Sequence, residues 1–229
     1  MTPERFQLLK QVLACRQADL TVLLDNIHKP HNLAAITRTA DATGILRVHG
    51  VGDIYLAKRR PKAASGSKRW TKLTMHKDCT TAIETLQQQG LAIVAADPCD
   101  TSIPFTEYDY TKPTAVVFGS ELTGLSDYAK QNADAHVHVP MLGFTESLNV
   151  SVTAALILYE AMQQRMKKGM YQKNSLDDEL YTKTLFEWTW PKLAHYCRGK
   201  NLPYPKFDLD TGDILETIPG SAGAPFPLS

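Results

Sequence analysis

The feature that most restricts the fold of this chain is a repeated alternation of short apolar runs with helical patterns. Runs typical of buried strands occur at residues 20–24, 46–51, 53–56, 91–96, 114–118 and 136–139. Helical periodicity lies between them, at 33–43, 80–89, 126–132 and about 148–168. Strands that alternate with helices predict an α/β fold, a mainly parallel sheet with helices on both faces.

Helical patterns also flank the predicted sheet at both ends. Residues 4–16 and 176–200 each have the apolar spacing of one amphipathic helix, and a turn is expected around 210–213. The tail 221–229 has a composition typical of disorder. We therefore expect an N-terminal helical extension at 1–18, a central domain at 19–170 and a C-terminal extension at 171–229.

Composition describes an ordinary globular chain, with 43% hydrophobic and 21% charged residues. No run approaches the roughly 18 apolar residues of a membrane span, and the amphipathic N-terminus lacks the apolar block of a signal peptide. We expect a cytoplasmic protein without membrane contact. The formal net charge of +1 argues against nonspecific coating of nucleic acid.

Several classes of site are poorly supported. The four cysteines lack ligand spacing, and His28 and His31 have no third ligand near them, so we expect neither a metal nor a disulfide framework. The chain also lacks the glycine-rich motifs of dinucleotide-binding and P-loop enzymes and the GxSxG motif of serine hydrolases.

Polar clusters follow three of the predicted strands. Asn32 and Arg38 follow the first, residues 119–121 follow the strand at 114–118, and residues 141–149 follow the strand at 136–139. Open α/β sheets bind ligands at the carboxyl ends of their strands, so these clusters are expected to converge on one site.

The long helix from about residue 148 carries a broad apolar stripe that predicts burial of most of its surface. Ser147 and Asn149 lie at its first turn, where free N–H groups favour oxygen-rich partners. One of the two is expected to be the N-cap, and the other remains for a different contact. Asn32 is likewise expected to cap the helix at 33–43, which Gly44 would end.

A basic segment lies between elements of the predicted sheet. Residues 58–72, KRRPKAASGSKRWTK, contain seven basic and no acidic residues, together with Trp70 for stacking on a base. This combination indicates RNA contact, although basic loops are often only solvated. Arg165 and Lys168 form a second basic patch, where positive charge also suits the end of a helix.

Three motifs together resemble a known family. HKPHNLAAITRTADATG (28–44), VVFGSELTGLS (116–126) and VPMLGFTESLNVSVTAALILYE (139–160) are similar to the motifs of the SPOUT RNA 2'-O-methyltransferases. Nearly the whole chain resembles the branch that methylates the ribose of guanosine 18 in the D-loop of tRNA. The resemblance implies an S-adenosylmethionine-dependent homodimer whose C-terminal segment is threaded as a trefoil knot.

The resemblance also implies roles for individual residues. The catalytic set is Asn32, Arg38, Glu121, Ser147 and Asn149, and cofactor contacts, largely from backbone, map to Ala96, Gly119, Val139, Met141 and Leu148. At Ala96 relatives often carry a hydroxyl, so only a backbone contact is expected there. The RNA-binding candidates are Arg59, Arg60, Lys62, Lys68, Arg69, Arg165 and Lys168.

Arg38 has two possible roles. The family's proposed base is this arginine, but a guanidinium with a pKa above about 12 remains protonated and suits a phosphate better. A simple helical pair with Asp41 is the structural alternative. Glu121 is expected to orient Asn32 or Arg38. Two other functions stay open: the same chemistry on ribosomal RNA or at the tRNA wobble position, and an RNA-binding or chaperone module without catalysis.

Overall fold

The computed structural model describes residues 1–27, 29–52 and 69–216. It forms two compact units, one at Arg16–Ser175 and the other at Met1–Cys15 together with the chain from Leu176 onward. The two terminal extensions expected from the sequence therefore belong to one unit. Its helices α1 (Pro3–Ala14) and α7 (Asp178–Thr189) contact each other, and α1 buries Phe6, Leu9 and Leu13.

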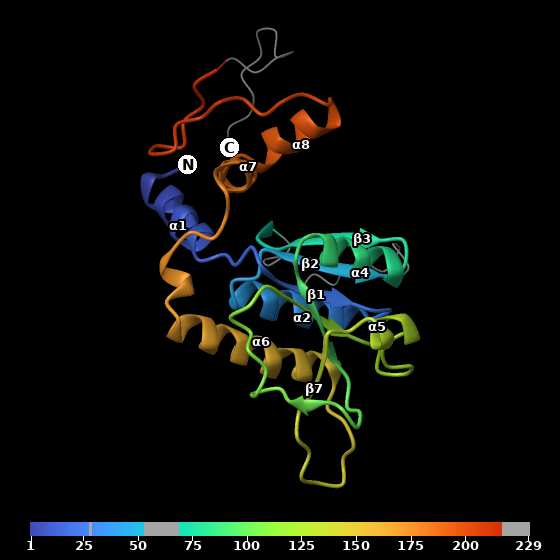
Figure 1. Cartoon of the computed structure of the whole chain (residues 1–229). Helices are drawn as coiled ribbons and strands as arrows, with labels where there is room; N and C mark the ends of the chain where they lie inside the picture. The colour runs from blue at the N-terminus through green and yellow to red at the C-terminus, as the bar shows by residue number, and fades with distance from the viewer. Residues whose placement is uncertain (28, 53–68, 217–229) are drawn as a thin grey trace. The chain divides into compact units, whose positions relative to one another are not determined.

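The larger unit is built on a seven-stranded sheet with the order β3-β2-β1-β6-β4-β7-β5, and every pairing between its strands is parallel (Figure 1). The mainly parallel sheet is therefore confirmed. Its strands are β1 (Leu20–Leu24), β2 (Arg47–Val51), β3 (Lys72–His76), β4 (Ala92–Ala96), β5 (Ile103–Pro104), β6 (Thr114–Phe118) and β7 (Ala135–His138).

Two strands were missed in the sequence, and both are edge strands. β3 is partly exposed, so it lacks the apolar run that marks β1 and β6. β5 has only two residues and includes Pro104, which suits an edge position because proline has no N–H to donate. The strand expected at 53–56 lies outside the described residues.

Helices cover both faces of the sheet, as the strand–helix alternation predicted. One core contains Leu20, Val22 and Leu24 of β1 together with α2 (Pro30–Ala42) and α6 (Val150–Lys167). The other contains Leu23 of β1, α4 (Cys79–Gln88) and α5 (Asp127–Gln131). Successive residues of a strand point to opposite faces, so an apolar strand such as β1 serves both cores.

The strand order places β1 and β6 side by side, although the chain leaves them in opposite directions. From β1 it continues to β2, whereas from β6 it continues to β7, beyond β4. Such a reversal opens a crevice at the carboxyl ends of the strands. The loops after β1, β6 and β7 lead from this edge, and the loop between β7 and α6 projects from the sheet in Figure 1.

The C-terminal helical region contains two helices where one was expected at 176–200. α7 ends at Thr189, and α8 (Pro191–Gly199) begins at a proline that cannot continue the preceding helix. Trp190, between them, donates its indole N–H to the Gly212 carbonyl at 2.9 Å. Gly212 has a φ of +82°, so the turn predicted at 210–213 is present. The tail 221–229 lies outside the described residues.

Two classes of feature are absent from the part of the chain that the structure describes. No helix there has the length and apolar character needed to cross a membrane. No group of three or more histidine, cysteine and acidic side chains there is placed to hold a metal ion.

Candidate active site

A pocket of about 640 Å³ lies at the carboxyl edge of the sheet, next to the ends of β4, β6 and β7. The pocket brings together all five predicted cofactor-binding residues and three of the predicted catalytic ones. These are Ala96, Gly119, Val139, Met141 and Leu148, with Glu121, Ser147 and Asn149.

The loop after β6 is folded tightly against itself. Gly119 lies so close to Gly124 that a Cβ added at Gly119 would lie 2.3 Å from the Gly124 carbonyl carbon, so only glycine fits. Ser120 and Gly124 exchange two backbone hydrogen bonds, of 3.0 and 2.9 Å. The buried Asp25 carboxylate at the end of β1 accepts the Ser126 N–H at 2.7 Å. Asp25 therefore fixes the loop that carries Glu121, a role that the sequence analysis missed.

Asn32 does not cap α2, contrary to the sequence prediction. The helix begins three residues earlier than predicted, at Pro30, because proline is favoured in the first turn, and Lys29 is the N-cap residue. Gly44, with a φ of +82°, follows the end of the helix as predicted. Asn32 is 2% exposed, and its side chain is directed into a polar cluster instead of capping the helix.

We define the amide–carboxylate cluster as Lys29, Asn32, Glu121 and Asn149. Asn32 Nδ2 donates to Glu121 Oε1 at 2.9 Å, and Asn149 Nδ2 donates to the same oxygen. Asn149 Nδ2 also lies 3.4 Å from Asn32 Oδ1. The loops after β1, β6 and β7 each contribute a residue, so three of the predicted catalytic side chains meet although they are far apart in the sequence.

Asn149 combines two roles at the start of α6. Its Oδ1 accepts the Ser151 N–H at 2.9 Å, so Asn149 is the N-cap residue, while its Nδ2 belongs to the cluster. Only one of the two candidates caps the helix, as the sequence analysis predicted. Ser147 is left over and lines the pocket two residues earlier.

Lys29 was not identified from the sequence. Its Nζ donates to Glu121 Oε2, the carboxylate oxygen that the two amides do not use. Hydrogen bonds from Lys29 and Asn32, in that order, lower the pKa of the Glu121 carboxyl, so it is ionised at neutral pH. The signal that could have found Lys29 is its position directly before Pro30, in the motif that contains Asn32.

Arg38 lies in a different hollow of the same unit. This hollow, of about 750 Å³, is between α2 and α6, and its lining includes Leu156, Tyr159 and Arg38. Arg38 is exposed and makes no hydrogen bond or ion pair with any described residue. The alternative pairing with Asp41 is wrong, because Asp41 pairs with the buried Arg16. Within one copy of the chain, Arg38 is therefore not part of the amide–carboxylate cluster.

The surface of α6 next to this hollow is apolar and exposed, contrary to the expected burial of most of the helix. Val152, Leu156, Tyr159 and Met166 have exposed fractions of 46, 39, 56 and 53%. These positions share one face of the helix, while the opposite face, with Ile157 and Leu158, lies in the core. We call these four residues the exposed face of α6.

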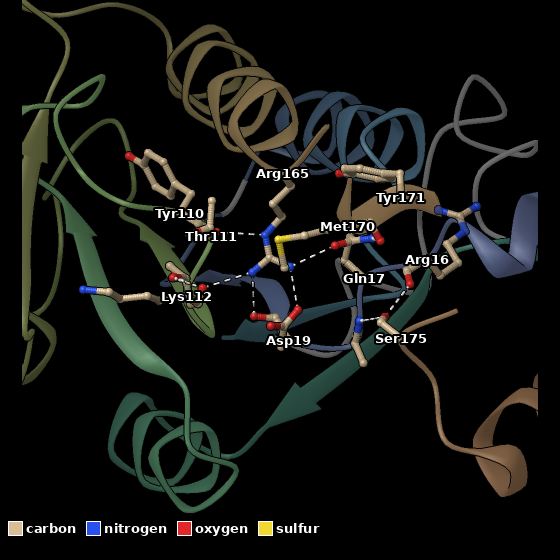
Figure 2. A network of polar contacts seen from close by, with 12 residues as sticks. Arg16, Gln17, Asp19, Tyr110, Thr111, Lys112, Arg165, Met170, Tyr171 and Ser175 are labelled. Atoms are coloured by element: carbon tan, nitrogen blue, oxygen red, sulfur yellow. Dashed lines mark hydrogen bonds and ion pairs between the residues drawn. The ribbon is translucent and has the colours of Figure 1, made fainter. Parts of the chain in front are cut away.

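Arg165, at the other end of α6, is a correction to the predicted RNA-binding set. Figure 2 shows its guanidinium enclosed by Gln17, Asp19, Tyr110 and Lys112. It is fully buried, pairs with Asp19, and donates to the carbonyls of Tyr110 at 2.8 Å and Lys112 at 3.0 Å. Its charge is compensated inside the protein, so it is not available to RNA.

Two of the other predicted RNA-binding residues, Lys168 and Arg69, lie in the described part of the chain. Lys168 is the exposed C-cap residue of α6. The guanidinium of Arg69 lies 4.6 Å from the centre of the Trp70 ring, a cation–π contact. Arg59, Arg60, Lys62 and Lys68 lie outside the described residues, as does His28.

Known proteins share both the fold and the sequence of this chain. It is 42% identical over 207 residues to the tRNA (guanosine(18)-2'-O)-methyltransferase of Escherichia coli K12, which covers 90% of each protein. The crystal structure of the A. aeolicus TrmH/SpoU tRNA modifying enzyme superposes with a TM-score of 0.76 and 38% identity, over 82% of this chain and 96% of that one.

A second similar structure was solved with the cofactor AdoMet. The SpoU methyltransferase AviRb from Streptomyces viridochromogenes, in complex with AdoMet, matches with a TM-score of 0.58 and 28% identity, over 64% of this chain and 60% of that one. The sequence model of the SpoU rRNA Methylase family matches residues 19–159, and that of the SpoU C-terminal region matches residues 163–217. The chain therefore belongs to the SpoU methylase family, an assignment that agrees with its sheet, its pocket and the three loops that meet there.

Proposed function

We propose that this protein is an S-adenosylmethionine-dependent RNA methyltransferase that methylates the ribose 2'-oxygen of guanosine 18 in tRNA. The observation that carries the proposal is the amide–carboxylate cluster at the edge of the 640 Å³ pocket. Its three loops supply the residues of the motifs that resemble the SPOUT family. The E. coli relative that covers 90% of the chain carries the same specificity in its name.

The pocket fits the proposed cofactor. Its volume lies within the range of roughly 300–1,000 Å³ that is usual for small-molecule sites. Ala96, Leu125 and Val137 give it apolar lining, and the strand ends present backbone polar groups. S-adenosylmethionine, when bound, supplies an electrophilic methyl group. We infer that Ala96, Gly119, Val139, Met141 and Leu148 hold it, largely through backbone.

The residues of the chain then have separate tasks. Glu121 fixes the side-chain amides of Asn32 and Asn149, and amides held in advance can orient the ribose beside the methyl donor without reorganising during the reaction. Ser147 contributes a hydroxyl at the same edge. A charged guanidinium is a poor base, so Arg38 holds a phosphate beside the reacting ribose, and that phosphate or an arranged water accepts the hydroxyl proton.

Arg38 reaches the site in this proposal through a second copy of the chain. The exposed face of α6 and the hollow beside Arg38 form a continuous apolar surface, which in a monomer would face water. A two-fold dimer through this surface buries it and brings Arg38 towards the partner's cluster. The proposal therefore includes a homodimer whose site is completed by both subunits.

Mixing two inactive variants tests the shared site. Arg38→Ala lacks the arginine and Asn149→Ser lacks the amide, so each homodimer is inactive. If Arg38 acts across the dimer, a mixed dimer has one intact site, and an equimolar mixture regains about a quarter of wild-type activity. No recovery in a mixture shown by mass spectrometry to contain mixed dimers would place Arg38 and Asn149 in the same subunit's site. A monomer in sedimentation experiments would remove the dimer from the proposal.

The substrate assignment is tested with unmodified tRNA transcripts and labelled methyl donor. We expect methyl incorporation that maps to guanosine 18. A matched transcript with 2'-deoxyguanosine at that position should accept none, because it lacks the reacting hydroxyl. Incorporation at another nucleotide, or only into ribosomal RNA, would overturn the proposed specificity. If no RNA were methylated, the alternative of an RNA-binding module without catalysis would replace the proposal.

Three further features belong to the same proposal. Arg69 and Lys168, with the basic residues of 58–68, contact RNA phosphates. The C-terminal part of the larger unit is threaded as the trefoil knot of the family, which an experimental structure would test. From the proposed tRNA substrate we infer a cytoplasmic location, which cell fractionation would test.

A further inference from the structure

We propose that Lys29 is a positioning residue for methyl transfer, which holds the Glu121 carboxylate so that its other oxygen aligns the amides of Asn32 and Asn149. The inference rests on the proposed function, because it concerns the same site. It adds a residue that touches neither the pocket nor the substrate in the scheme above and acts only through Glu121.

The inference rests on the observation that the two carboxylate oxygens of Glu121 have different partners. Oε2 accepts from Lys29 Nζ, whereas Oε1 accepts from both Asn32 Nδ2 and Asn149 Nδ2. A carboxylate held at only one oxygen can rotate about its terminal torsion, which is broad. Contact at both oxygens fixes its plane, so Lys29 determines where Oε1 lies and therefore where the amides point.

The backbone around Lys29 is suited to this task. Its carbonyl accepts the N–H groups of Asn32 at 3.1 Å and Leu33 at 3.2 Å, and Pro30 follows it directly. Lys29 and Asn32 are therefore joined within one helical turn, and each contacts a different oxygen of Glu121. The Lys29 side chain is 59% exposed, so its removal should change the stability of the fold little.

The positive charge of Lys29 is a second reason to assign it a role beside Glu121. A carboxylate at the edge of an RNA site repels the phosphates of the substrate, and a lysine in contact with it cancels that charge. Among the described residues, Lys29 is the cation in contact with Glu121. The other charged or titratable groups near the site are His31 on α2, Asp97 with its partner Lys130, and Glu146 and His138 in the pocket lining.

The test compares Lys29→Met, which keeps length but removes charge, with Lys29→Arg, which keeps the charge. Lys112→Met is the control, because it removes another exposed lysine from an ion pair, that with Asp109, in the same unit. We expect Lys29→Met to lower kcat by about 10- to 100-fold, because misplacement of a reacting group by 1 Å can cost that much. The KM for S-adenosylmethionine should not change, Lys29→Arg should recover most of the rate, and the control should behave as wild type.

The pH profile separates positioning from a general structural defect. Lys29 favours the ionised form of Glu121, so its removal should raise the Glu121 pKa and shift the acidic limb of kcat to higher pH. Equal kcat values and limbs in wild type and Lys29→Met would overturn the inference. So would a loss that Lys29→Arg fails to recover at all.

A titration without RNA keeps this inference distinct from the proposed function. Carbon-13 NMR of labelled glutamate follows the Glu121 carboxyl, assigned by its loss in Glu121→Gln. A higher pKa in Lys29→Met than in wild type supports the contact, and an unchanged pKa overturns it. A wild-type protein that methylates no tRNA would overturn the proposed function, and the titration would still decide whether Lys29 holds Glu121.

Discussion

The two ends of α6 both carry charged or amide side chains, but they use them in different ways. At its N-terminus, Asn149 joins Lys29, Asn32 and Glu121 beside a pocket, and the Lys29 side chain is 59% exposed. At its C-terminus, the Arg165 side chain is fully buried and bonded to Asp19 and to backbone carbonyls.

The difference separates groups that stabilise the fold from groups that serve function. A buried guanidinium with an opposite charge and full hydrogen bonding is part of the structure, and removal of one partner leaves the others uncompensated. Exposed polar groups around a pocket contribute little to stability, but they remain available to a ligand. Substitutions at these two ends should therefore differ in whether they affect stability or activity.

Arg165→Met should lower the free energy of unfolding by about 3–5 kcal/mol, because Asp19 is left partly buried without its partner. Urea denaturation measures the effect, and Lys168→Met, at the exposed end of the same helix, is the control. A small loss of stability, together with weaker tRNA binding, would mean that the two ends of α6 do not differ in this way.

Asn149→Ser should lower kcat by about 100- to 1,000-fold, which is typical for loss of a positioned hydrogen-bond donor. Serine is also a good N-cap, so the free energy of unfolding should change by only a few tenths of a kcal/mol, by analogy with exchanges among capping residues. Single-turnover rates and urea denaturation measure the two effects. A large loss of stability with a normal rate would reverse the roles assigned to the two ends.

The His49–His76 pair contains another buried titratable side chain, that of His49, whose neighbours His76 and Arg47 carry no negative charge. His49 Nδ1 lies 2.8 Å from His76 Nε2. Burial is the main cause that lowers the pKa of His49 to about 4, and the nearby His76 and Arg47 lower it further. The unfolded chain binds a proton near pH 6.5, so stability should be constant above that value and fall by about 3 kcal/mol towards pH 4. Unfolding measured between pH 7 and 4 checks this, and His49→Asn should show a flatter profile.

Lys168→Ala should have the smallest effect. It should weaken tRNA binding only a few-fold and reduce the slope of log affinity against log salt by about 1, as expected for one lost phosphate contact. The kcat at saturating tRNA should not change. A salt dependence equal to that of wild type would remove Lys168 from the RNA-binding surface.

The central fold was largely predictable because its signals are local and strong. The runs at 20–24 and 114–118 became β1 and β6 with the predicted bounds, since an apolar run of five residues fits a strand buried on both faces. Edge strands such as β3 and β5 lack that signal. The break at Pro191 was missed because apolar spacing on both sides of it resembles one continuous helix.

Three residues of the site were predictable from motif resemblance and from the positions of the strand ends. Motif resemblance named Asn32, Glu121 and Asn149, and the strand ends placed their loops at one edge of the sheet. Neither could identify Lys29 as a partner of Glu121, because that contact depends on how the start of α2 meets the loop after β6. Neither could show that Arg38 lies in another hollow, because its position depends on which faces of α2 and α6 meet.

Apolar periodicity depends on residues close in the chain, so the sequence was enough to predict the mainly parallel sheet and the loops at its carboxyl edge. For the cap of α6 it left two candidates, Ser147 and Asn149, and the structure selects Asn149. Whether a charged side chain is buried or exposed depends on contacts between distant segments, which only the folded structure shows. Arg165 and Lys168 are three residues apart on one helix and look alike in the sequence. One is enclosed by segments from distant parts of the chain and the other faces water, and only the folded environment determines that difference.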